Sequence, residues 1–576
     1  MTAPAVATRP RARWILPDAP DPAVVRTLCD ELLLPEPICR LLATRGHAPA
    51  ELAKRYLRPR LDQLLPPEQL RDLDRAVDRL VRAVRGGETI LVHGDYDVDG
   101  ICSTTLMVKT LRALGGTAVP FIPQRLVDGY DLGDAGVRAA RAHGATVVVT
   151  CDCGTSALAP VAALQSAGVD VIVSDHHLPG GDLPQAYAVL NPKRPGCESE
   201  DKDLAAVGVA FKLALAVTRA MRGNENVVYG MLDLVALATI ADIAPLRGEN
   251  RVFARYGLKL LAETKNIGLR ALIRATGMDN KVLTAGRVGF ILAPRLNAVG
   301  RLGHALRGVE LLLATSEHEA NAIARELEEL NARRQEIDRA VLVEARKRVA
   351  ELDLDETYGI VLAEEGWHPG VIGIVASRIV EEFGRPTILI GLDGGQGKGS
   401  GRSISRFDLH AGIARCRHLL ARFGGHRSAA CVSIARDRVE EFARCFNESA
   451  RSVLTADDLV PELRVDMEVS LADLTPGFES LLRHLEPCGV GNPAPVLMTR
   501  GVRLASPPRV VGQEGGGLKL RLETDAGAPL DAIGWSLGPR AGELDVARPF
   551  DIAYRLERDE WQGVSRLQVK LADFRT

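Results

Sequence analysis

Short apolar runs that alternate with helical periods are the feature that most restricts the fold of this chain. Residues 89–92, 145–150 and 169–174 are apolar runs of strand length, and Met107 and Leu111, between the first two runs, recur at helical spacing. A strand that pairs in parallel with the previous one needs a long crossover connection, usually a helix. The pattern therefore predicts a doubly wound, parallel α/β sheet.

Changes of pattern along the chain predict five segments. Residues 1–85 are rich in proline and short helical periods and predict a helical N-terminal preface, followed by the parallel-sheet domain at 86–315. Residues 316–352 contain no glycine or proline and predict one long connecting helix. A smaller α/β domain is expected at 353–452. The two-fold alternation within 453–576 predicts a small β-barrel.

Composition restricts the class of protein. The 576 residues include 72 Lys and Arg against 74 Asp and Glu, a formal charge of -2, so a polyanionic partner would have to meet a local basic surface. No apolar stretch approaches the roughly 18 residues that a membrane span needs. The ten cysteines include no CxxC spacing, which disfavours a zinc site at the close pair Cys151 and Cys153. We expect a cytoplasmic protein in a reducing compartment, with no membrane association.

The strongest chemical signal is the segment HGDYDVDG at 93–100, directly after the first predicted strand. It crowds an imidazole and three carboxylates into seven residues: His93, Asp95, Asp97 and Asp99. A bound divalent cation would relieve the repulsion between these carboxylates, whereas the alternative is a solvated acidic loop. A calcium loop of the EF-hand type would need a glutamate at its twelfth position, which is occupied by Leu106.

Further acidic and imidazole side chains follow the next predicted strands. Asp152 lies just past the second run, Asp175, His176 and His177 lie just past the third, and Asp242 follows an apolar helix. Ligands gather at the carboxyl edge of open α/β sheets, so we expect these groups to meet there. Asp and His without clustered thiolates suit Mn²⁺ or Mg²⁺. Two such ions would activate water and neutralise the charge that develops on a phosphodiester.

The order of these motifs resembles the DHH phosphoesterase superfamily. Four segments carry that resemblance: HGDYDVDG, TCDCGTS (150–156), SDHH (174–177) and ADIAP (241–245). Five later segments are similar to the RecJ family of single-strand-specific exonucleases within it: LAPRLNAVGRLG (292–303), GWHPGVIGIVASRI (366–379), SGRSISRFDL (400–409), GGHRSAA (424–430) and LEPCGVGNPAP (485–495). The resemblance implies a DHH domain joined by a long helix to a DHHA1 domain, then an OB-fold-like barrel that binds nucleic acid.

The resemblance also implies roles for particular residues. Two ions, Mn²⁺ or Mg²⁺, would be held by six ligands, with Asp152 bridging the ions: His93, Asp97, Asp99, Asp152, His176 and Asp242. Asp95 and Asp175 would support these ligands from behind. Asp152 also belongs to the catalytic group, whose other members would lie near the reacting phosphate: His177, Asn297 and Arg301.

A local basic surplus marks the expected contact with the strand. Residues 398–427 contain seven Lys or Arg and a single Asp in an otherwise near-neutral chain. A solvated basic face is the alternative for an isolated cluster. We expect the glycine-rich segment 391–401 to be a loop that leads to Arg402. The resemblance implies that Arg402 and His426 contact the DNA strand. Backbone amides exposed by the glycines add Ser403 and Gly425 as expected contacts, and Arg378 is a further candidate near the phosphate.

The sequence thus predicts a two-metal exonuclease. The resemblance implies that it degrades single-stranded DNA from the 5′ end to mononucleotides in DNA repair and recombination, as a monomer, with single-strand-binding protein and a RecQ-type helicase as partners. A phosphodiesterase for short oligonucleotides or cyclic dinucleotides, a pyrophosphatase, and a non-catalytic single-strand binder are the alternatives. Trp535 and Trp561 could stack bases. A core position is the more common fate of a tryptophan, so neither is assigned to the site.

Overall fold

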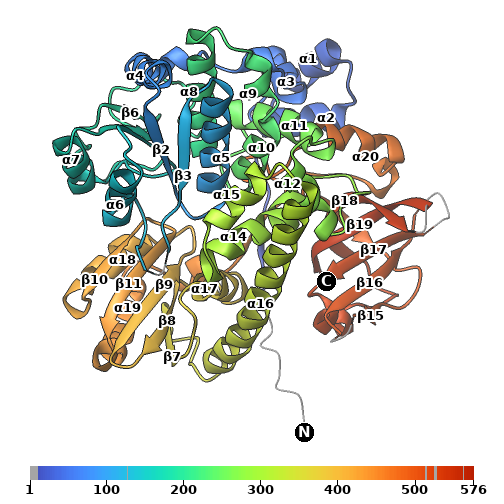
Figure 1. Cartoon of the computed structure of the whole chain (residues 1–576). Helices are drawn as coiled ribbons and strands as arrows, with labels where there is room; N and C mark the ends of the chain where they lie inside the picture. Colours follow the sequence, from blue (N-terminus) through green and yellow to red (C-terminus); the bar gives the residue numbers. More distant parts are fainter. Residues whose placement is uncertain (1–10, 126, 513–514, 525–528, 562–563) are drawn as a thin grey trace. The chain divides into compact units, whose positions relative to one another are not determined.

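A computed structural model describes the chain from residue 11 to residue 576, except for 126, 513–514, 525–528 and 562–563 (Figure 1). The chain folds into two compact units. One, here called the parallel-sheet unit, consists of Pro59–Gln335 and Pro487–Pro493. The other, here called the two-sheet unit after the two larger of its three sheets, consists of Met1–Arg58, Glu336–Glu486 and Ala494–Thr576. Each unit is therefore assembled from segments that are separated in sequence.

The parallel-sheet unit is built on five parallel strands, as the sequence predicts. The strands are β2 (Thr89–Gly94), β3 (Thr117–Phe121), β4 (Val147–Cys151), β5 (Asp170–Ser174) and β6 (Ala188–Leu190). Their order is β3-β2-β4-β5-β6, and every neighbouring pair is parallel. The carboxyl ends of β2, β4 and β5 consequently lie side by side, because these strands are neighbours.

Helices cover both faces of this sheet, because its strands bury side chains on both sides. Ile90 and Val149 pack with α4 (Leu73–Arg85), α5 (Val98–Ala113), α8 (Ala206–Ala220) and α10 (Leu232–Ala241). Leu91 and Val148 point the other way and pack with α6 (Asp134–Ala142) and α7 (Leu158–Ser166). The unit continues with α9 (Glu225–Tyr229), α11 (Gly248–Ala262), α12 (Ile267–Ala275), α13 (Ala285–Arg287), η3 (Val288–Leu292), α14 (Ala293–Leu302) and α15 (Leu306–Leu313).

A buried ion pair joins α8 to α11. The Lys212 Nζ atom lies 2.8 Å from Glu249 Oε1, and the two side chains are only 3% and 1% exposed. The segment before α4 closes this pair, since Leu65 accepts a hydrogen bond from Lys212 Nζ and donates one to Glu249 Oε1. Each of two charges that are buried together needs the other, because a buried charge without its partner is strongly destabilising. The pair therefore fixes α8 at the centre of the unit.

Removal of the Glu249 carboxylate should destabilise the protein. Glu249→Leu leaves the Lys212 ammonium buried without its ionic partner, and such changes cost about 3–5 kcal/mol. We expect the free energy of unfolding in urea, followed by circular dichroism, to fall by that order. The double variant Lys212→Met, Glu249→Leu removes both charges and should recover most of the loss. Equal losses in the single and double variants would contradict an ionic origin.

The first sheet of the two-sheet unit mixes parallel and antiparallel pairs. Its strands are β7 (Ile360–Glu365), β8 (Thr387–Asp393), β9 (Gln396–Arg402), β10 (Arg422–Gly425) and β11 (Ala429–Ala435), in the order β10-β11-β9-β8-β7. Only β7 and β8 pair in parallel. The helices α17 (Ile372–Phe383) and α19 (Val439–Arg451) pack in separate hydrophobic clusters, while α18 (Leu409–Arg415) shares the cluster of α19.

The glycine-rich segment is a strand, which corrects the expectation of a loop. Gly397, Gly399 and Gly401 all lie in β9, and a Cβ added to any of them would meet a side-chain carbon of a neighbouring strand at 2.6–3.0 Å. The glycines therefore serve close packing inside the sheet. Arg402 consequently stands at the end of a strand, where its backbone is held by pairing on both sides.

The second sheet contains the C-terminal strands. They are β13 (Met467–Glu468), β14 (Leu497–Val502), β15 (Arg509–Val511), β16 (Gly517–Leu522), β17 (Leu530–Trp535), β18 (Phe550–Trp561) and β19 (Val564–Arg575), in the order β13-β14-β18-β19-β17-β16-β15. Trp535, expected in the core, is 59% exposed at the end of β17. Trp561 lies outside the residues whose side chains the structure describes.

The N-terminal helices share the core of this C-terminal sheet. They are α1 (Pro22–Leu32), α2 (Glu36–Thr44) and α3 (Ala50–Leu57). Leu28 and Leu41 belong to the same hydrophobic cluster as Leu520 and Tyr554. In addition, β1 (Arg13–Ile15) pairs with β12 (Glu462–Arg464). The N-terminal segment is therefore part of the C-terminal core, a relation that local sequence patterns do not reveal.

Two further features bear on the expectations from sequence. The long helix α16 runs from Glu317 to Ala350, close to the predicted 316–352, and among the described helices none is both long and apolar enough to cross a membrane. A disulfide joins Cys416 to Cys445, with their Cα atoms 6.0 Å apart. The expectation of a reducing compartment did not suggest this pair, and nothing in the sequence relates two residues that pack together through α18 and α19.

Candidate metal centre

The acidic and imidazole residues meet at the carboxyl edge of the parallel sheet. They form three overlapping sets in which the ligand atoms lie within 4.8 Å of one another: Asp152, His176 and His177; Asp99, His176 and Asp242; and Asp95, Asp97 and Asp152. Asp152 and His176 each belong to two sets and so link all three. The structure thereby brings together groups that are almost 150 residues apart in sequence, as the strand-end positions predict.

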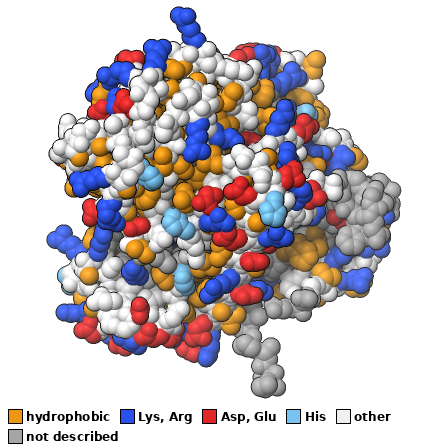
Figure 2. All heavy atoms as spheres, viewed as in Figure 1, with side chains coloured by type: hydrophobic (Ala, Val, Ile, Leu, Met, Phe, Trp, Pro, Cys, Tyr) orange, Lys and Arg blue, Asp and Glu red, His pale blue; other side chains and the backbone are white. Residues whose placement is uncertain are grey.

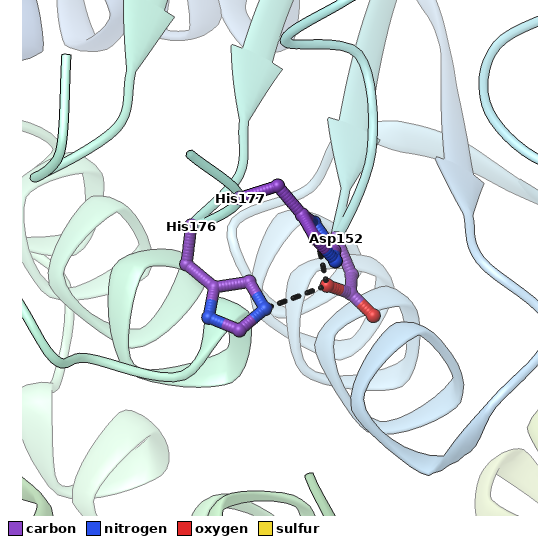
Figure 3. A group of neighbouring side chains, drawn as sticks. All are labelled: Asp152, His176 and His177. Carbon is purple, nitrogen blue, oxygen red and sulfur yellow. Dashed lines mark ion pairs between the residues drawn. The ribbon is translucent and has the colours of Figure 1, made fainter. Parts of the chain in front are cut away.

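Asp152 occupies the centre of this arrangement in a strained conformation. Its φ of 69° is left-handed, a region that costs a residue other than glycine about 1–3 kcal/mol. The amide of Asp152 donates to Ser174 O at 3.0 Å, which holds the backbone in place. The carboxylate lies between the two histidines, with Oδ1 at 3.3 Å from His176 Nε2 and 3.7 Å from His177 Nδ1 (Figure 3).

Backbone amides hold the acidic loop at the start of α5. Asp97 Oδ1 accepts from the amides of Asp99 and Gly100, at 2.9 and 3.2 Å, and so caps the helix. Asp99 accepts two bonds of 2.8 Å from the amides of Ala206 and Val207, the first residues of α8. The positive end of a helix dipole favours a carboxylate at this position. Two helix N-termini therefore meet at the acidic loop.

Burial makes the charged forms of these carboxylates costly. Burial, followed by repulsion from neighbouring carboxylates, raises the pKa of Asp95, Asp152 and Asp242 well above the usual range and that of Asp99 to about 7. Burial lowers the pKa of His176 to about 3, which leaves its imidazole neutral and able to bind a metal. Nearby positive charge would be needed to keep all four carboxylates ionised.

Several polar atoms of the cluster are suited to a cation because nothing else satisfies them. His93 Nε2, Asp95 Oδ1, Asp152 Oδ1 and His176 Nε2 are buried and have no hydrogen-bond partner among the described residues. Buried polar atoms are almost always hydrogen-bonded, so such a concentration of exceptions needs an explanation. Oxygen and imidazole ligands at this spacing fit the donor preferences of Mn²⁺ and Mg²⁺.

His93 does not join these sets. Its imidazole is fully buried, and burial lowers its pKa to about 4. Nδ1 lies 3.5 Å from Cys153 Sγ, and Nε2 would lie 2.8 Å from a Cβ added to Gly136 in α6. The ring therefore packs between β2 and α6, and its nitrogens stay outside the three groups found in the described part of the chain. The sequence motif places His93 beside the ligands, but the direction of its ring depends on this packing.

Asp175, which the sequence analysis expects behind the ligands, holds the turn that carries the two histidines. Its Oδ1 accepts from the amides of His176 and His177 and lies 2.8 Å from His177 Nδ1, while Oδ2 accepts from Thr155 N. Burial alone would raise the pKa of Asp175, but the hydrogen bond and charge of His177 outweigh it and lower the pKa. Asp175 thus fixes the orientation of the turn that carries both imidazoles.

Tyr130 is a neighbour of the site that the sequence analysis missed. Its hydroxyl lies 3.2 Å from His177 Nδ1 and 3.4 Å from Asp152 O. The segment around it has neither strand nor helix periodicity, and Asp131 Oδ1 ties it to the site by accepting from Gly154 N at 2.6 Å. The one sequence signal available for Tyr130 was that an aromatic residue lies in the loop after β3, a strand of the parallel sheet.

Asn297 and Arg301 lie in α14, which packs on the acidic loop. Asn297 Oδ1 accepts from Val98 N, at the first turn of α5. Gly300 allows the two backbones to approach, because a Cβ there would lie 2.2 Å from Tyr96 O. Arg301, one residue later, is half-buried. The contacts of Asn297 and Gly300 make α14 a brace for the loop.

Four of the residues predicted to contact the DNA strand lie close together in the two-sheet unit. Arg402 pairs with Ala429 across β9 and β11, and Ser403 N donates to Ser428 O beside it. Gly425, with a φ of 141°, ends β10, and His426 N turns back to Ala429 O. Arg402, Ser403, Gly425 and His426 therefore occupy adjoining strand ends and turns.

Arg378, the fifth residue predicted to contact the DNA strand, is held in an ion pair. Its guanidinium lies 2.9 Å from the buried carboxylate of Asp338 in α16. Its helix, α17, passes close to Arg402, since a Cβ on Gly373 would lie 3.0 Å from Arg402 Nη2. On the face shown in Figure 2, basic and acidic side chains are interspersed, in keeping with the net charge of -2. Recognition of a polyanion would thus depend on local groups.

Three family models match the chain, each on a separate sheet. The DHH family, N-terminal domain, matches residues 89–239, the DHHA1 domain matches 356–452, and the RecJ OB domain matches 465–573. These ranges contain the parallel sheet, the five-stranded mixed sheet and most of the seven-stranded sheet, respectively. Together with the metal-binding geometry, they define the class of the protein as a DHH-type phosphoesterase. The predicted fold class is thereby confirmed.

Relatives narrow this class. The chain is 35% identical over 565 residues to the single-stranded-DNA-specific exonuclease RecJ of Bacillus subtilis, covering 98% of this chain and 71% of that protein. It is 38% identical to RecJ of Salmonella typhimurium, with 94% and 96% covered. The crystal structure of RecJ from Thermus thermophilus in complex with Mn²⁺ matches with a TM-score of 0.84 at 32% identity, over 98% of this chain and 80% of that one. The Mg²⁺ complex of RecJ from that organism matches with a TM-score of 0.79 at 30% identity, over 98% and 79%. The chain therefore belongs to the RecJ family.

Gly100→Ala should disturb the acidic loop. An added Cβ would lie 2.3 Å from Asp95 O and 2.5 Å from Asp95 N, so the backbone has to shift. We expect a fall of about 1–3 kcal/mol in the free energy of unfolding by denaturant titration. Gly286→Ala in α13 is the matched control, because the nearest atom, Thr284 Oγ1, would be 3.9 Å away. That control should be neutral or stabilising, since alanine favours a helix over glycine. Equal losses in both variants would argue against the close approach.

Proposed function

We propose that this protein is a metal-dependent exonuclease that hydrolyses single-stranded DNA. The observation that carries the proposal is the linkage of three buried ligand sets through Asp152 and His176. Membership of the RecJ family supports the single-strand substrate, and the Mn²⁺ and Mg²⁺ complexes of a relative support the metal requirement. The test is incubation of end-labelled single strands and duplexes with Mn²⁺, Mg²⁺ or chelator. Selective degradation of single strands that stops with chelator is the expected result.

The ligand assignment follows from the sets. We assign Asp97, Asp152 and Asp99 together with His176 and Asp242 to the two ions, with Asp152 shared between them. Asp95 belongs to one set with Asp97 and Asp152, which supports it as a further ligand and extends its expected supporting role. His93, which the family resemblance also makes a ligand, keeps its place in the assignment, because its buried Nε2 has no hydrogen-bond partner among the described residues and is available to a cation. When bound, the two ions supply an activated water and neutralise the charge that develops on the phosphate.

The remaining residues of the site hold these groups in position. Asp175 fixes the rings of His176 and His177 through the hydrogen bonds described above, and Asn297 fixes the loop by accepting from Val98 N. We assign His177 and Arg301 to contact the phosphate of the substrate. Such prepositioned groups need little rearrangement when the substrate binds, which lowers the barrier to reaction.

The finer parts of the proposal rest on the family resemblance. They are degradation from the 5′ end to mononucleotides, action in repair and recombination as a monomer in the cytoplasm, and cooperation with single-strand-binding protein and a RecQ-type helicase. Substrates labelled separately at each end test the polarity. Recovery of label as mononucleotide from the 5′ end at early times is the expected outcome.

Asp152→Asn should abolish hydrolysis, because an amide lacks the negative charge that two cations require. We expect turnover of a single strand in Mn²⁺ to fall by at least a thousandfold, on the order of 4 kcal/mol in the activation barrier. The increase in thermal stability on addition of Mn²⁺ should also shrink, which circular dichroism measures. Asp279→Asn, at an exposed position of the same unit, is the control. Near-normal turnover in Asp152→Asn would overturn the assignment.

Arg402→Ala and His426→Ala should weaken strand binding. Each lost phosphate contact should flatten the log–log dependence of affinity on salt by about 0.7 for a single strand. Hydrolysis of bis-p-nitrophenyl phosphate, which has no strand to hold, should change less. The control is Arg438→Ala, whose guanidinium pairs with Glu441 elsewhere in the same unit. Variants at Arg402 and His426 with the wild-type slope and affinity would remove these residues from the binding surface.

A further inference from the structure

Phe290 presents its ring to solvent in the parallel-sheet unit, which also contains the metal ligands. The side chain is 86% exposed, whereas Val288 and Leu292, two residues away on either side, are fully buried. All three residues belong to η3, a single π-helical turn between α13 and α14. The two buried side chains anchor the turn in the core. The ring of Phe290 consequently faces outward as a fixed feature of the helix.

The sequence explains this wide turn. Pro294 has no amide hydrogen, so the carbonyl of Phe290 cannot receive the usual bond from a residue four positions later. The amide of Ala293 instead donates to Val288 O, five residues back, which is the bond of a π-helix. Such turns are frequent at functional sites because they redirect side chains without breaking the helix.

The turn lies against the helix that leads to the metal centre. A Cβ on Gly289 would lie 3.5 Å from Ile240 Cγ2, near the C-terminal end of α10. Asp242, a member of the ligand sets, directly follows that helix. The next residue, Ile243, has a left-handed φ of 60° and is 65% exposed. Ile243 is therefore an exposed apolar residue directly beside Asp242, and Phe290 follows the residue that packs against the end of α10.

Other exposed apolar groups border the same centre. Leu178, directly after His177, is 64% exposed, and Tyr130, whose hydroxyl contacts His177, is 48% exposed. Scattered apolar residues on a protein surface need no explanation, but apolar groups gathered around polar ligands mark a binding site. Mn²⁺ and Mg²⁺ favour oxygen ligands, so in a strand they are suited to the phosphates. These exposed apolar side chains are suited to contact the base that lies beside each phosphate.

We propose that Phe290 stacks on a nucleobase of the bound strand and so sets which phosphodiester reaches the metals. This inference rests on the proposed function and assigns to it a further substrate-binding residue. Every base has a π-face, so stacking on one ring tolerates any sequence. It also restricts the strand, because a base paired within a duplex has its faces covered by neighbouring pairs. A rigid helical turn would hold the base at a fixed distance from Asp242.

The stacking is tested by a double-mutant cycle, in which one change removes the ring from the protein and the other removes a base from the DNA. Strand binding is measured by fluorescence anisotropy in chelator, so that the strand is not cut, with an abasic site placed at successive positions from the 5′ end. For the wild type, one position should weaken binding by about tenfold, equivalent to about 1.4 kcal/mol. Phe290→Ala should bind the intact strand about tenfold more weakly than the wild type does. In this variant an abasic site at that position should cause no further loss of affinity, because the stacking ring is already absent. Losses that multiply at every position would overturn the inference.

Two further variants separate stacking from folding defects. Phe290→Trp keeps an aromatic face and should restore wild-type affinity. Leu33→Ala removes an equally exposed apolar side chain, 88% exposed at the end of α1, and should leave binding unchanged. The increase in thermal stability on addition of Mn²⁺ should be equal in all of these proteins, because none of the changed side chains belongs to the ligand sets. Unaltered affinity in Phe290→Ala would overturn the inference.

The same measurements distinguish this inference from the proposed function. A wild-type protein that degrades no single strand in Mn²⁺ or Mg²⁺ would overturn the proposed function. A wild type that degrades single strands, beside a Phe290→Ala variant that binds and cuts them equally well, would overturn the stacking alone.

Discussion

The concentration of buried carboxylates at one edge of a parallel sheet is the constraint on which the rest of this structure depends. Asp99 and Asp152 are nearly inaccessible to water, and their charged forms are costly there. The fold lowers part of that cost with backbone amides, most clearly where the first turn of α8 holds both oxygens of Asp99. Amide dipoles supply only partial charge, so cations complete the balance. A site of this kind is stable as a metal centre because the sheet core is large enough to hold its parts together.

The helix α8 connects this electrostatic requirement to the core. Its N-terminus binds Asp99, and two turns further on Lys212 forms the buried pair with Glu249. Each contact fixes the position of the helix along its axis. The acidic loop therefore faces a helix end whose place is set by a second charged interaction. Metal-ligand geometry tolerates little displacement, which gives a physical reason for so many buried polar contacts around one helix.

The sequence predicts the parts of the structure that follow from local pattern and sheet geometry. Strand ends of a parallel sheet meet at one edge, which is why Asp152 and His176 could be placed together without knowledge of any tertiary contact. The ring direction of His93 could not be predicted, since it depends on packing against Gly136 in another helix. The same holds for the glycine-rich strand β9 and for Tyr130 in its irregular loop. The shared core of α1–α3 and the C-terminal sheet is missed for a similar reason, because hydrophobic periodicity shows which face is buried and not what covers it.

The segment from Val288 to Leu302 shows how a stretch of sequence that contains no member of the ligand sets can still act on the site. Pro294 opens the π-turn that carries Phe290, and Asn297 and Gly300, one and two turns later, hold the acidic loop. These residues lie on one continuous helical segment. The exposed ring and the acidic loop are therefore held in position by the same rigid element. A loop could not fix that relation, because its length and direction vary with thermal motion. An enzyme that removes nucleotides one after another needs the same spacing between a bound base and the reacting phosphate at every step. The helix is the part of this structure that can supply it.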